Sequence, residues 1–156
     1  MELGHFYFIS SKYFEQFPSA TLMINRQVSD GQLHNRPYLL AFSDKEGIYW
    51  AVPISSRVDK FKEMYARKVH KYKRCDTIDF CEVLGHTKAI LIQNMTPVTA
   101  EYIQNAYLDG NKNLIQLAYK DNKRIVRRAK KVLELQRKGY DLIWGKPLEI
   151  ESELAK

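Results

Sequence analysis

The stretch that decides the fold runs from a strand-forming segment into polar and cationic side chains: Tyr49-Trp50-Ala51-Val52-Pro53-Ile54-Ser55-Ser56-Arg57-Val58-Asp59-Lys60. Aromatic and β-branched residues favour a strand through Ile54, and Pro53, which has no N–H donor, favours a strand end or bulge. The serines are therefore predicted to lie where the sheet opens. Ser hydroxyls bind phosphate, an Arg guanidinium holds two oxygens, and a Lys ammonium places a charge or moves a proton. This pattern indicates a phosphate-handling site, with a solvated strand-to-loop junction as the alternative.

A second motif lies near the start of the chain. It reads His5-Phe6-Tyr7-Phe8-Ile9-Ser10-Ser11-Lys12-Tyr13-Phe14. Together with the segment from Pro53 to Lys60, it resembles the endoribonuclease toxins of type III toxin-antitoxin systems, the ToxN/AbiQ/CptN family, and most of all the CptN branch. In that family an early strand ends in an Ile-Ser-Ser-Lys-Tyr pattern, and a later strand ends in a Pro-Leu-Thr-Ser-type turn followed by a catalytic lysine. The resemblance extends more weakly over most of the chain.

One departure from the family pattern falls in the turn itself. The family carries Pro after the serine with Lys directly behind it, whereas here Ser56 is followed by Arg57, Val58 and Asp59 before Lys60. One inserted residue aligns Lys60-Phe61 with the basic-aromatic pair of the family, and the ungapped alignment selects Arg57. Lys60 is the first choice for the catalytic cation, and Arg57 is the alternative.

The resemblance implies a metal-independent, sequence-selective endoribonuclease that needs no cofactor and cuts single-stranded RNA through its 2′-hydroxyl to a 2′,3′-cyclic phosphate. It also implies inhibition by a small RNA antitoxin made of pseudoknot repeats, in a closed assembly of several toxin and RNA copies. Such a protein need only position the strand, move protons and stabilise the pentavalent phosphate. The candidate catalytic residues are Ser55, Ser56, Lys60, Arg57 and Tyr13.

The charge distribution supports a nucleic-acid partner independently of the resemblance. The formal net charge is +7, and residues 57–74 hold eight Lys and Arg against two acids while residues 112–138 hold ten against two. These stretches carry +6 and +8, which leaves −7 for the remainder. Concentrated positive charge is expected of a surface that binds a polyanion, and two solvated surface segments are the alternative. The candidate RNA-binding residues are Lys12, Arg36, Lys62, Arg67, Lys68, Lys71, Lys73, Arg74, Lys123, Arg124, Arg127, Arg128 and Lys131.

Strand-forming segments come early in the chain and helical ones late, which predicts an α+β fold. We expect a compact, strongly bent antiparallel sheet or partial barrel covered by C-terminal helices, and the family resemblance implies a barrel of the MazF/Kid type. With 156 residues and 45% apolar content, the chain 1–156 suits a single domain. The predicted strands are 6–10, 38–42, 48–54, 77–84 and 88–93, with a hairpin turn from Ser43 to Gly47.

The remaining segments are predicted from breakers and helical spacing. Residues 25–37 are expected to form a long loop, and residues 61–72 either a short basic helix or a loop that orders on binding. Thr96-Pro97 is predicted to begin a helix that ends at Asp109-Gly110. A second helical region carries two apolar stripes and ends at Gly139; the stripes are Leu114, Leu117 and Ala118, then Ile125, Ala129, Val132 and Leu133 within the basic stretch 123–138.

Other classes of protein fit the sequence less well. No signal peptide or membrane-spanning run is visible, so the chain is expected in the cytoplasm, away from membranes. His70, Cys75, Cys81 and His86 are spaced H-x4-C-x5-C-x4-H, which does not match a zinc knuckle, and the cysteines are expected to be reduced. The main alternative is a non-catalytic protein that binds structured RNA. A DNA-binding regulator is disfavoured because Gln136 is the one base-reading amide well inside 123–138.

Overall fold

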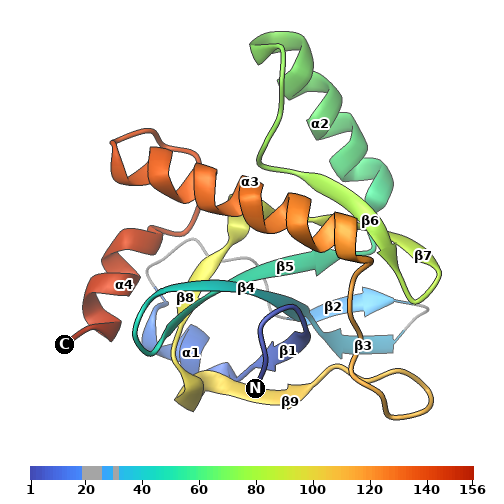
Figure 1. Cartoon of the computed structure of the whole chain (residues 1–156), viewed down its shortest axis with the longest axis vertical. Coiled ribbons are helices and arrows are strands. Elements are labelled where there is room, and N and C mark those ends of the chain that lie inside the picture. Colours follow the sequence, from blue (N-terminus) through green and yellow to red (C-terminus); the bar gives the residue numbers. More distant parts are fainter. Residues whose placement is uncertain (19–25, 30–31) are drawn as a thin grey trace.

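A bent antiparallel sheet forms the centre of the protein in the computed structural model, which describes residues 1–18, 26–29 and 32–156 (Figure 1). Its seven strands follow the order β6-β7-β5-β4-β1-β9, with β8 paired to β5. The strands are β1 (Phe6–Ile9), β4 (Pro37–Lys45), β5 (Ile48–Ser55), β6 (Asp79–Val83), β7 (His86–Ile90), β8 (Thr96–Val98) and β9 (Ile103–Ala106). The predicted bent sheet is confirmed, and the path of hydrogen-bonded strands begins at β6 and ends at β9.

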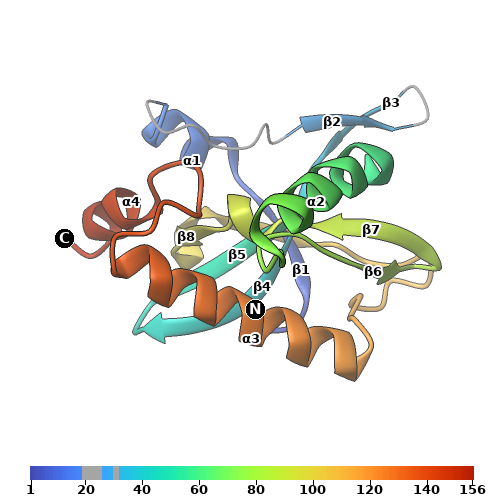
Figure 2. The same cartoon turned by 90° about the horizontal axis from the view of Figure 1, so that it is seen from above.

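Helices cover both faces of this sheet, as the α+β prediction requires. They are α1 (Ser11–Gln16), α2 (Val58–Tyr72), α3 (Tyr119–Arg137) and α4 (Pro147–Leu154), with short 3-10 turns η1 (Ile92–Asn94) and η2 (Ala100–Tyr102). α3 crosses one face, while α1 and α4 lie against the other (Figure 2). α2 packs through Phe61 on Ala89 and Leu91, at and just beyond the end of β7. Of the two alternatives for residues 61–72, the helix is therefore the one observed.

β5 changes partner along its length. On one edge it pairs with β4 from Lys45↔Ile48 to Tyr38↔Pro53. On the other edge its first half pairs with β8, and Ile54 and Ser55 pair with β7. Pro53 stands at the change of partner, where its missing N–H leaves no donor unpaired and its carbonyl accepts from Leu91 N at 3.0 Å. The proline thus marks a junction inside the strand, and β5 continues two residues beyond it.

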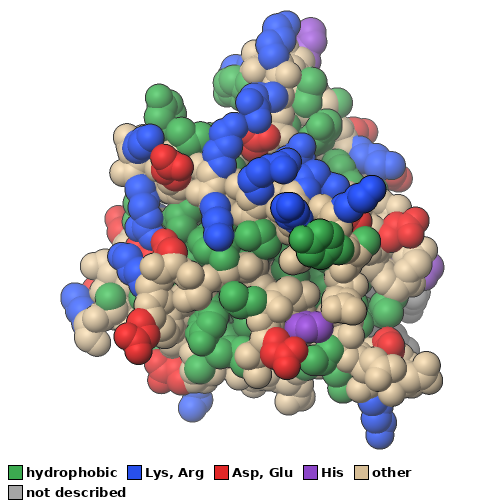
Figure 3. Space-filling model, viewed as in Figure 1, with side chains coloured by type: hydrophobic (Ala, Val, Ile, Leu, Met, Phe, Trp, Pro, Cys, Tyr) green, Lys and Arg blue, Asp and Glu red, His purple; other side chains and the backbone are tan. Residues whose placement is uncertain are grey.

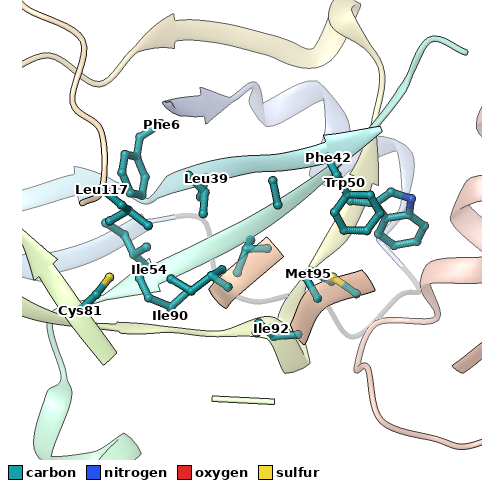
Figure 4. Close-up of a cluster of buried hydrophobic side chains, with 14 of the residues drawn as sticks. Phe6, Leu39, Phe42, Trp50, Ile54, Cys81, Ile90, Ile92, Met95 and Leu117 are labelled. Atoms are coloured by element: carbon teal, nitrogen blue, oxygen red, sulfur yellow. The ribbon is translucent and has the colours of Figure 1, made fainter. Parts of the chain in front are cut away.

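Alternating side chains divide the core between the two faces. Trp50, Val52 and Ile54 of β5 join the cluster beneath α3, whereas Ala51 joins the cluster on the opposite face. Figure 4 shows the first cluster, in which side chains from β1, β4, β5 and β7 meet. The predicted apolar stripe of α3 closes it through Ile125, Ala129, Val132 and Leu133, all buried. Both faces of β5 are therefore covered by packed side chains.

The predicted helix over 123–138 is confirmed with an earlier start at Tyr119. Gly139 follows it with φ +103°, and its N–H donates to the Gln136 carbonyl at 3.1 Å. A positive φ of this kind suits glycine after a helix C-terminus. The predicted C-terminal cap is therefore in place.

The predicted helix from Thr96 to Asp109 is wrong. Thr96 to Val98 form β8, and Ile103 to Ala106 form β9, with η2 between them. β8 pairs with β5 and β9 with β1, so pairing with the sheet overrides the local cap signal. The helical stripe of Leu114, Leu117 and Ala118 is also wrong, because Ile115 and Leu117 are buried while Leu114 and Gln116 are exposed, which is the alternation of an extended chain.

The predicted loop over 25–37 is wrong where the structure describes it. Arg26–Ser29 (β2) and Gln32–Asn35 (β3) pair as an antiparallel hairpin, and Pro37 begins β4. Residues 25 and 30–31 of that prediction lie outside the described residues. The other predicted strands keep their positions with shifted ends, and Lys45↔Ile48 closes the predicted hairpin turn.

α4 is fastened to α3 by a buried carboxylate. Glu151 is 3% exposed, and both of its oxygens accept from Arg137 at 2.8 Å. Lys45 Nζ lies 3.3 Å from the same carboxylate, and Arg137 also reaches Asp44 at 2.9 Å. These ion pairs join α3, α4 and the β4–β5 turn. The hydrogen bonds from Arg137 lower the pKa of Glu151 below its ordinary value, against the effect of burial.

We expect Glu151→Gln to lower the free energy of unfolding at neutral pH by about 2 kcal/mol, because a charge-assisted pair is lost. The depressed pKa means that Glu151 stabilises the fold above its unfolded-state pKa and loses this effect as pH falls through its folded-state pKa. Urea unfolding from pH 7 to pH 3 should therefore show a weaker acid dependence in the variant. Glu153→Gln, an exposed position of the same helix, is the control. Equal acid dependence in Glu151→Gln and wild type would contradict the assignment.

Candidate active site

The residues of the central motif lie at one end of the sheet, where three strands meet. β1 and β5 end there, and β4 begins there because it runs antiparallel to both. Pro37 lies opposite Phe8, and Tyr38 lies opposite Pro53, so Arg36 enters the sheet beside the ends of both neighbours. The fold thus brings segments that are distant in sequence to one place.

Arg36 is the buried cation of this end of the sheet. It is 5% exposed, and its Nη1 donates to the Ile54 carbonyl at 2.9 Å. Burial lowers the pKa of the guanidinium below its ordinary value; Tyr38 acts against this shift, and the charge of Arg57 adds to it. Because an arginine remains protonated through such a shift, Arg36 and Arg57 concentrate positive charge at the end of β5.

The two serines of the motif have different positions. Ser55 is buried, and its Oγ accepts the Arg57 N–H at 3.2 Å, which holds the turn between β5 and α2. Ser56 is exposed. The structure therefore gives Ser55 a part in shaping the turn and leaves the Ser56 hydroxyl on the surface.

α2 begins directly at the motif. Arg57 is its N-cap residue, and Lys60 stands in its first turn, with both side chains exposed. The first backbone N–H groups of a helix have no partner within the helix and carry partial positive charge. Lys60 Nζ lies 5.3 Å from the centre of the buried Phe61 ring, which is a cation–π contact. Both alternatives for the family lysine thus lie at the start of α2, the kind of helix end that favours an anion.

Ser10 also lies at this end of the sheet. It belongs to the N-terminal motif, but no role was predicted for it from the sequence. It follows β1 and is 7% exposed, and its backbone N–H donates to the Tyr102 carbonyl at 2.8 Å. Its Oγ is buried and has no hydrogen-bond partner among the described residues. An unpaired buried hydroxyl costs about 1–3 kcal/mol, so it calls for an explanation. A hydroxyl residue at the end of a predicted strand was the sequence feature that could have marked Ser10 as a candidate site residue.

Tyr13 packs inside the protein. Its side chain is fully buried, and its hydroxyl donates to the Pro97 carbonyl at 2.6 Å and lies 2.7 Å from Thr96 Oγ1. Burial raises the pKa of this hydroxyl above its ordinary value. The structure gives Tyr13 a packing position between α1 and β8, not the exposed position that a phosphate contact requires.

The predicted RNA-binding residues divide into two groups. Lys and Arg side chains gather over α2 and α3 on the face shown in Figure 3. The exposed ones are Lys12, Lys62, Arg67, Lys71, Lys73, Arg74, Lys123, Arg127 and Lys131. The others bind within the protein. Arg36 is buried and donates to the Ile54 carbonyl, Arg124 and Arg128 both reach the buried Asp79 at 2.9 Å, and Lys68 Nζ donates to Gln93 Oε1 at 2.6 Å. Lys131 and Arg74, although exposed, pair with Asp76.

The cysteines of the zinc hypothesis are free and buried in the protein. Cys81 packs in β6 as predicted, and burial raises the pKa of its thiol to about 12, which disfavours the thiolate that a metal needs. His70 and His86 are exposed. No three His, Cys, Asp or Glu side chains of the described residues lie together as metal ligands. Over the same residues, no helix is long and apolar enough to cross a membrane.

The fold resembles that of two solved proteins of type III toxin-antitoxin systems, the systems whose toxins the two sequence motifs resemble. AbiQ, a lactococcal anti-phage endoribonuclease of a type III system, matches with a TM-score of 0.66 and 18% identity over 97% of this chain and 96% of AbiQ. A structure from work on bacterial type III systems, in which an RNA pseudoknot selectively inhibits the toxin, matches with a TM-score of 0.58 and 21% identity over 85% and 79% of the two chains. Neither protein-family profiles nor curated protein sequences gave a match.

The division of the basic residues predicts different effects for neighbouring arginines. Arg124→Ala should lower the free energy of unfolding by about 2 kcal/mol, because the buried Asp79 loses a charge-assisted partner. Arg127→Ala, at an exposed position, should change it by less than about 0.5 kcal/mol. Arg127→Ala should instead weaken RNA binding and reduce the salt slope of affinity by about 0.7, the value for one phosphate of a single strand.

Urea unfolding and RNA titrations at two salt concentrations measure both effects. Equal stability losses in Arg124→Ala and Arg127→Ala would contradict the stabilising role given to the Arg124–Asp79 pair. An unchanged salt slope in Arg127→Ala would remove that side chain from the RNA-binding surface.

Proposed function

We propose that the protein is a metal-independent endoribonuclease toxin of a type III toxin-antitoxin system. The observation that carries this proposal is the grouping of Arg36, Ser56, Arg57 and Lys60 at one end of the sheet. The shared fold with AbiQ supports it. RNA brings its own nucleophile, so a protein that supplies cations, donors and a proton carrier is sufficient for cleavage.

The proposed reaction is a transesterification within the RNA. The 2′-hydroxyl loses its proton to water as its oxygen attacks the adjacent phosphorus, and the bond from phosphorus to the 5′-oxygen breaks. The 5′-oxygen takes up a proton, so a 2′,3′-cyclic phosphate and a 5′-hydroxyl form. Arg57 and the N–H groups at the start of α2 bind the non-bridging oxygens as negative charge develops, with Arg36 behind them. Ser56 donates to the same phosphate. Lys60 stabilises the charge or returns a proton to the leaving 5′-oxygen.

The proposed partner in the cell is a small RNA antitoxin with a pseudoknot fold, which would occupy the basic surface and block substrate RNA. The second structural neighbour, from work on type III systems in which an RNA pseudoknot selectively inhibits the toxin, supports this. The exposed cations of α2 and α3 exceed what one scissile phosphate uses. In this proposal several toxin and RNA copies form a closed assembly in the cytoplasm, and loss of the antitoxin frees the enzyme to cut cellular or phage RNA.

A non-catalytic RNA-binding protein is the second candidate. It is favoured by the position of Ser55, whose buried hydroxyl already binds the Arg57 N–H. In that case the serine turn would bind a phosphate without cutting the strand. Discrete cuts in RNA after expression of the toxin without its antitoxin separate the two candidates.

Alanine at Ser56, Arg57 or Lys60 should reduce single-turnover cleavage of single-stranded RNA, with at least one variant losing about 100-fold because a donor to the developing charge is removed. All three side chains are exposed, so the fold should be unchanged. Lys156→Ala and Ser152→Ala, exposed positions in and after α4, are the controls. If Arg57→Ala loses the most, Arg57 takes the place of the family lysine. Wild-type rates in all three variants would overturn the site.

Cleavage should continue in excess EDTA, because no step of the proposed reaction uses a metal ion. Mass spectrometry of the products should show 2′,3′-cyclic phosphate and 5′-hydroxyl ends. Loss of activity on chelation that magnesium or zinc restores would instead require a metal-assisted mechanism.

A further inference from the structure

A hollow of about 540 Å³ lies between the C-terminal ends of α2 and α3. Tyr72 and Lys68 of α2 line one side of it, and Tyr140, Asp141 and Trp144 from the segment after α3 line the other. Its volume falls within the range of small-ligand sites, about 300–1,000 Å³. The 15-residue α2 separates it by about 20 Å from Arg57, at 1.5 Å per residue. The hollow is therefore distinct from the candidate active site.

Exposed aromatic rings are concentrated at this hollow. Tyr72, Tyr140 and Trp144 are 62%, 60% and 48% exposed. Among the described residues, Tyr119 is the one other large aromatic side chain of comparable exposure. Aromatic rings normally lose most of their surface to packing, so three exposed rings around one hollow indicate a surface that another planar group covers.

The segment that carries two of these rings is held in place. The Gln136 side-chain oxygen accepts the N–H groups of Leu142 and Ile143 at 2.7 and 2.9 Å. The backbone N–H of Trp144 donates to the backbone carbonyl of the fully buried Gln93 at 2.8 Å. The rings therefore stand on a fixed backbone, and a ligand would bind without the cost of ordering this segment.

The polar groups of the hollow suit a nucleotide. Lys68 Nζ donates to Gln93 Oε1 and to Thr77 Oγ1 at 3.0 Å, which fixes a cation in the wall. Lys71 does not line the hollow, but its Nζ lies 5.1 Å from the centre of the Tyr72 ring, so a second positive charge stands beside the aromatic surface. The Asp141 carboxylate accepts hydrogen bonds and matches the amino groups of a base edge. Rings for stacking, cations for a phosphate and an acceptor for a base are thus present together.

We propose that this hollow binds one unpaired nucleotide of a single-stranded RNA, with its base stacked on the exposed rings and its phosphate beside the lysines. The inference rests on the proposed function only in taking RNA as the partner. Stacking on aromatic side chains is how proteins hold unpaired bases with little sequence preference. The nucleotide in the hollow is remote from the scissile phosphate, so the hollow contributes affinity and not chemistry.

Binding of a fluorescently labelled 2′-O-methyl decanucleotide of randomised sequence tests the proposal, because this probe cannot be cut. At a rise of 3.4 Å per stacked nucleotide it spans about 30 Å, enough to reach from the active site to the hollow. Tyr72→Ala and Tyr140→Ala should each weaken binding by about 5- to 100-fold. Tyr72→Phe and Tyr140→Phe keep the rings and should bind like wild type. Tyr119→Ala, which removes an exposed ring outside the hollow, should change affinity less than twofold.

Tryptophan fluorescence gives a second readout. The chain has two tryptophans, and Trp50 is fully buried while Trp144 is half-exposed. The decanucleotide should quench emission in wild type, and Trp144→Phe should abolish quenching while keeping the affinity. Alanine variants that bind like wild type, phenylalanine variants that fail to rescue, or a ten-base-pair RNA duplex that competes as well as the single strand would each overturn the proposal.

Cleavage by the wild-type enzyme separates failure of this inference from failure of the proposed function. If wild type cuts RNA and the alanine variants bind normally, the hollow is not a nucleotide site and the endoribonuclease proposal stands. If wild type does not cut RNA but the alanine variants lose affinity, the hollow is a nucleotide site on a non-catalytic RNA-binding protein.

Discussion

The structure depends on β5, a strand buried on both faces and paired on both edges. Such a strand must satisfy every backbone donor, and it does so with β4 on one edge and with β8 and then β7 on the other. Pro53 makes the change of partner possible because it has no donor to leave unpaired. The helices on both faces pack on this arrangement, since α3 closes one face and α1 and α4 close the other. The polar end of the same strand is where the candidate active site lies.

Much of the fold was predictable because several segments carry strong local signals. β-Branched and aromatic residues marked the strands that build the sheet, and the stripe from Ile125 to Leu133 marked the helix that covers it. The predicted helix at Thr96 failed because Thr96-Pro97, a good helix start, forms part of β8, the three-residue strand that pairs with β5. Sequence alone does not show which long-range partner is available. The stretch around Leu117 failed for a related reason, because a few apolar residues fit either a period of two or a helical period.

The candidate site was predicted in its central motif and missed in its periphery. The turn from Ser55 to Lys60 can be recognised in the sequence because hydroxyl and cationic residues directly follow an apolar strand. Arg124 and Arg127 look alike in sequence, yet one holds a buried carboxylate and the other faces solvent. That distinction depends on where Asp79 lies, 45 residues away along the chain. Tyr13 likewise sits in a polar motif but turns inward, because the ring fills space between helix and sheet.

The connection between β5 and α2 consists of Ser56 and Arg57 alone. α2 is also held along its length, because Phe61 packs against Ala89 and Leu91, and Lys68 Nζ binds Thr77 and Gln93. Lys60 in the first turn and Tyr72 in the last therefore keep a constant separation. An RNA strand that contacts both must match this spacing.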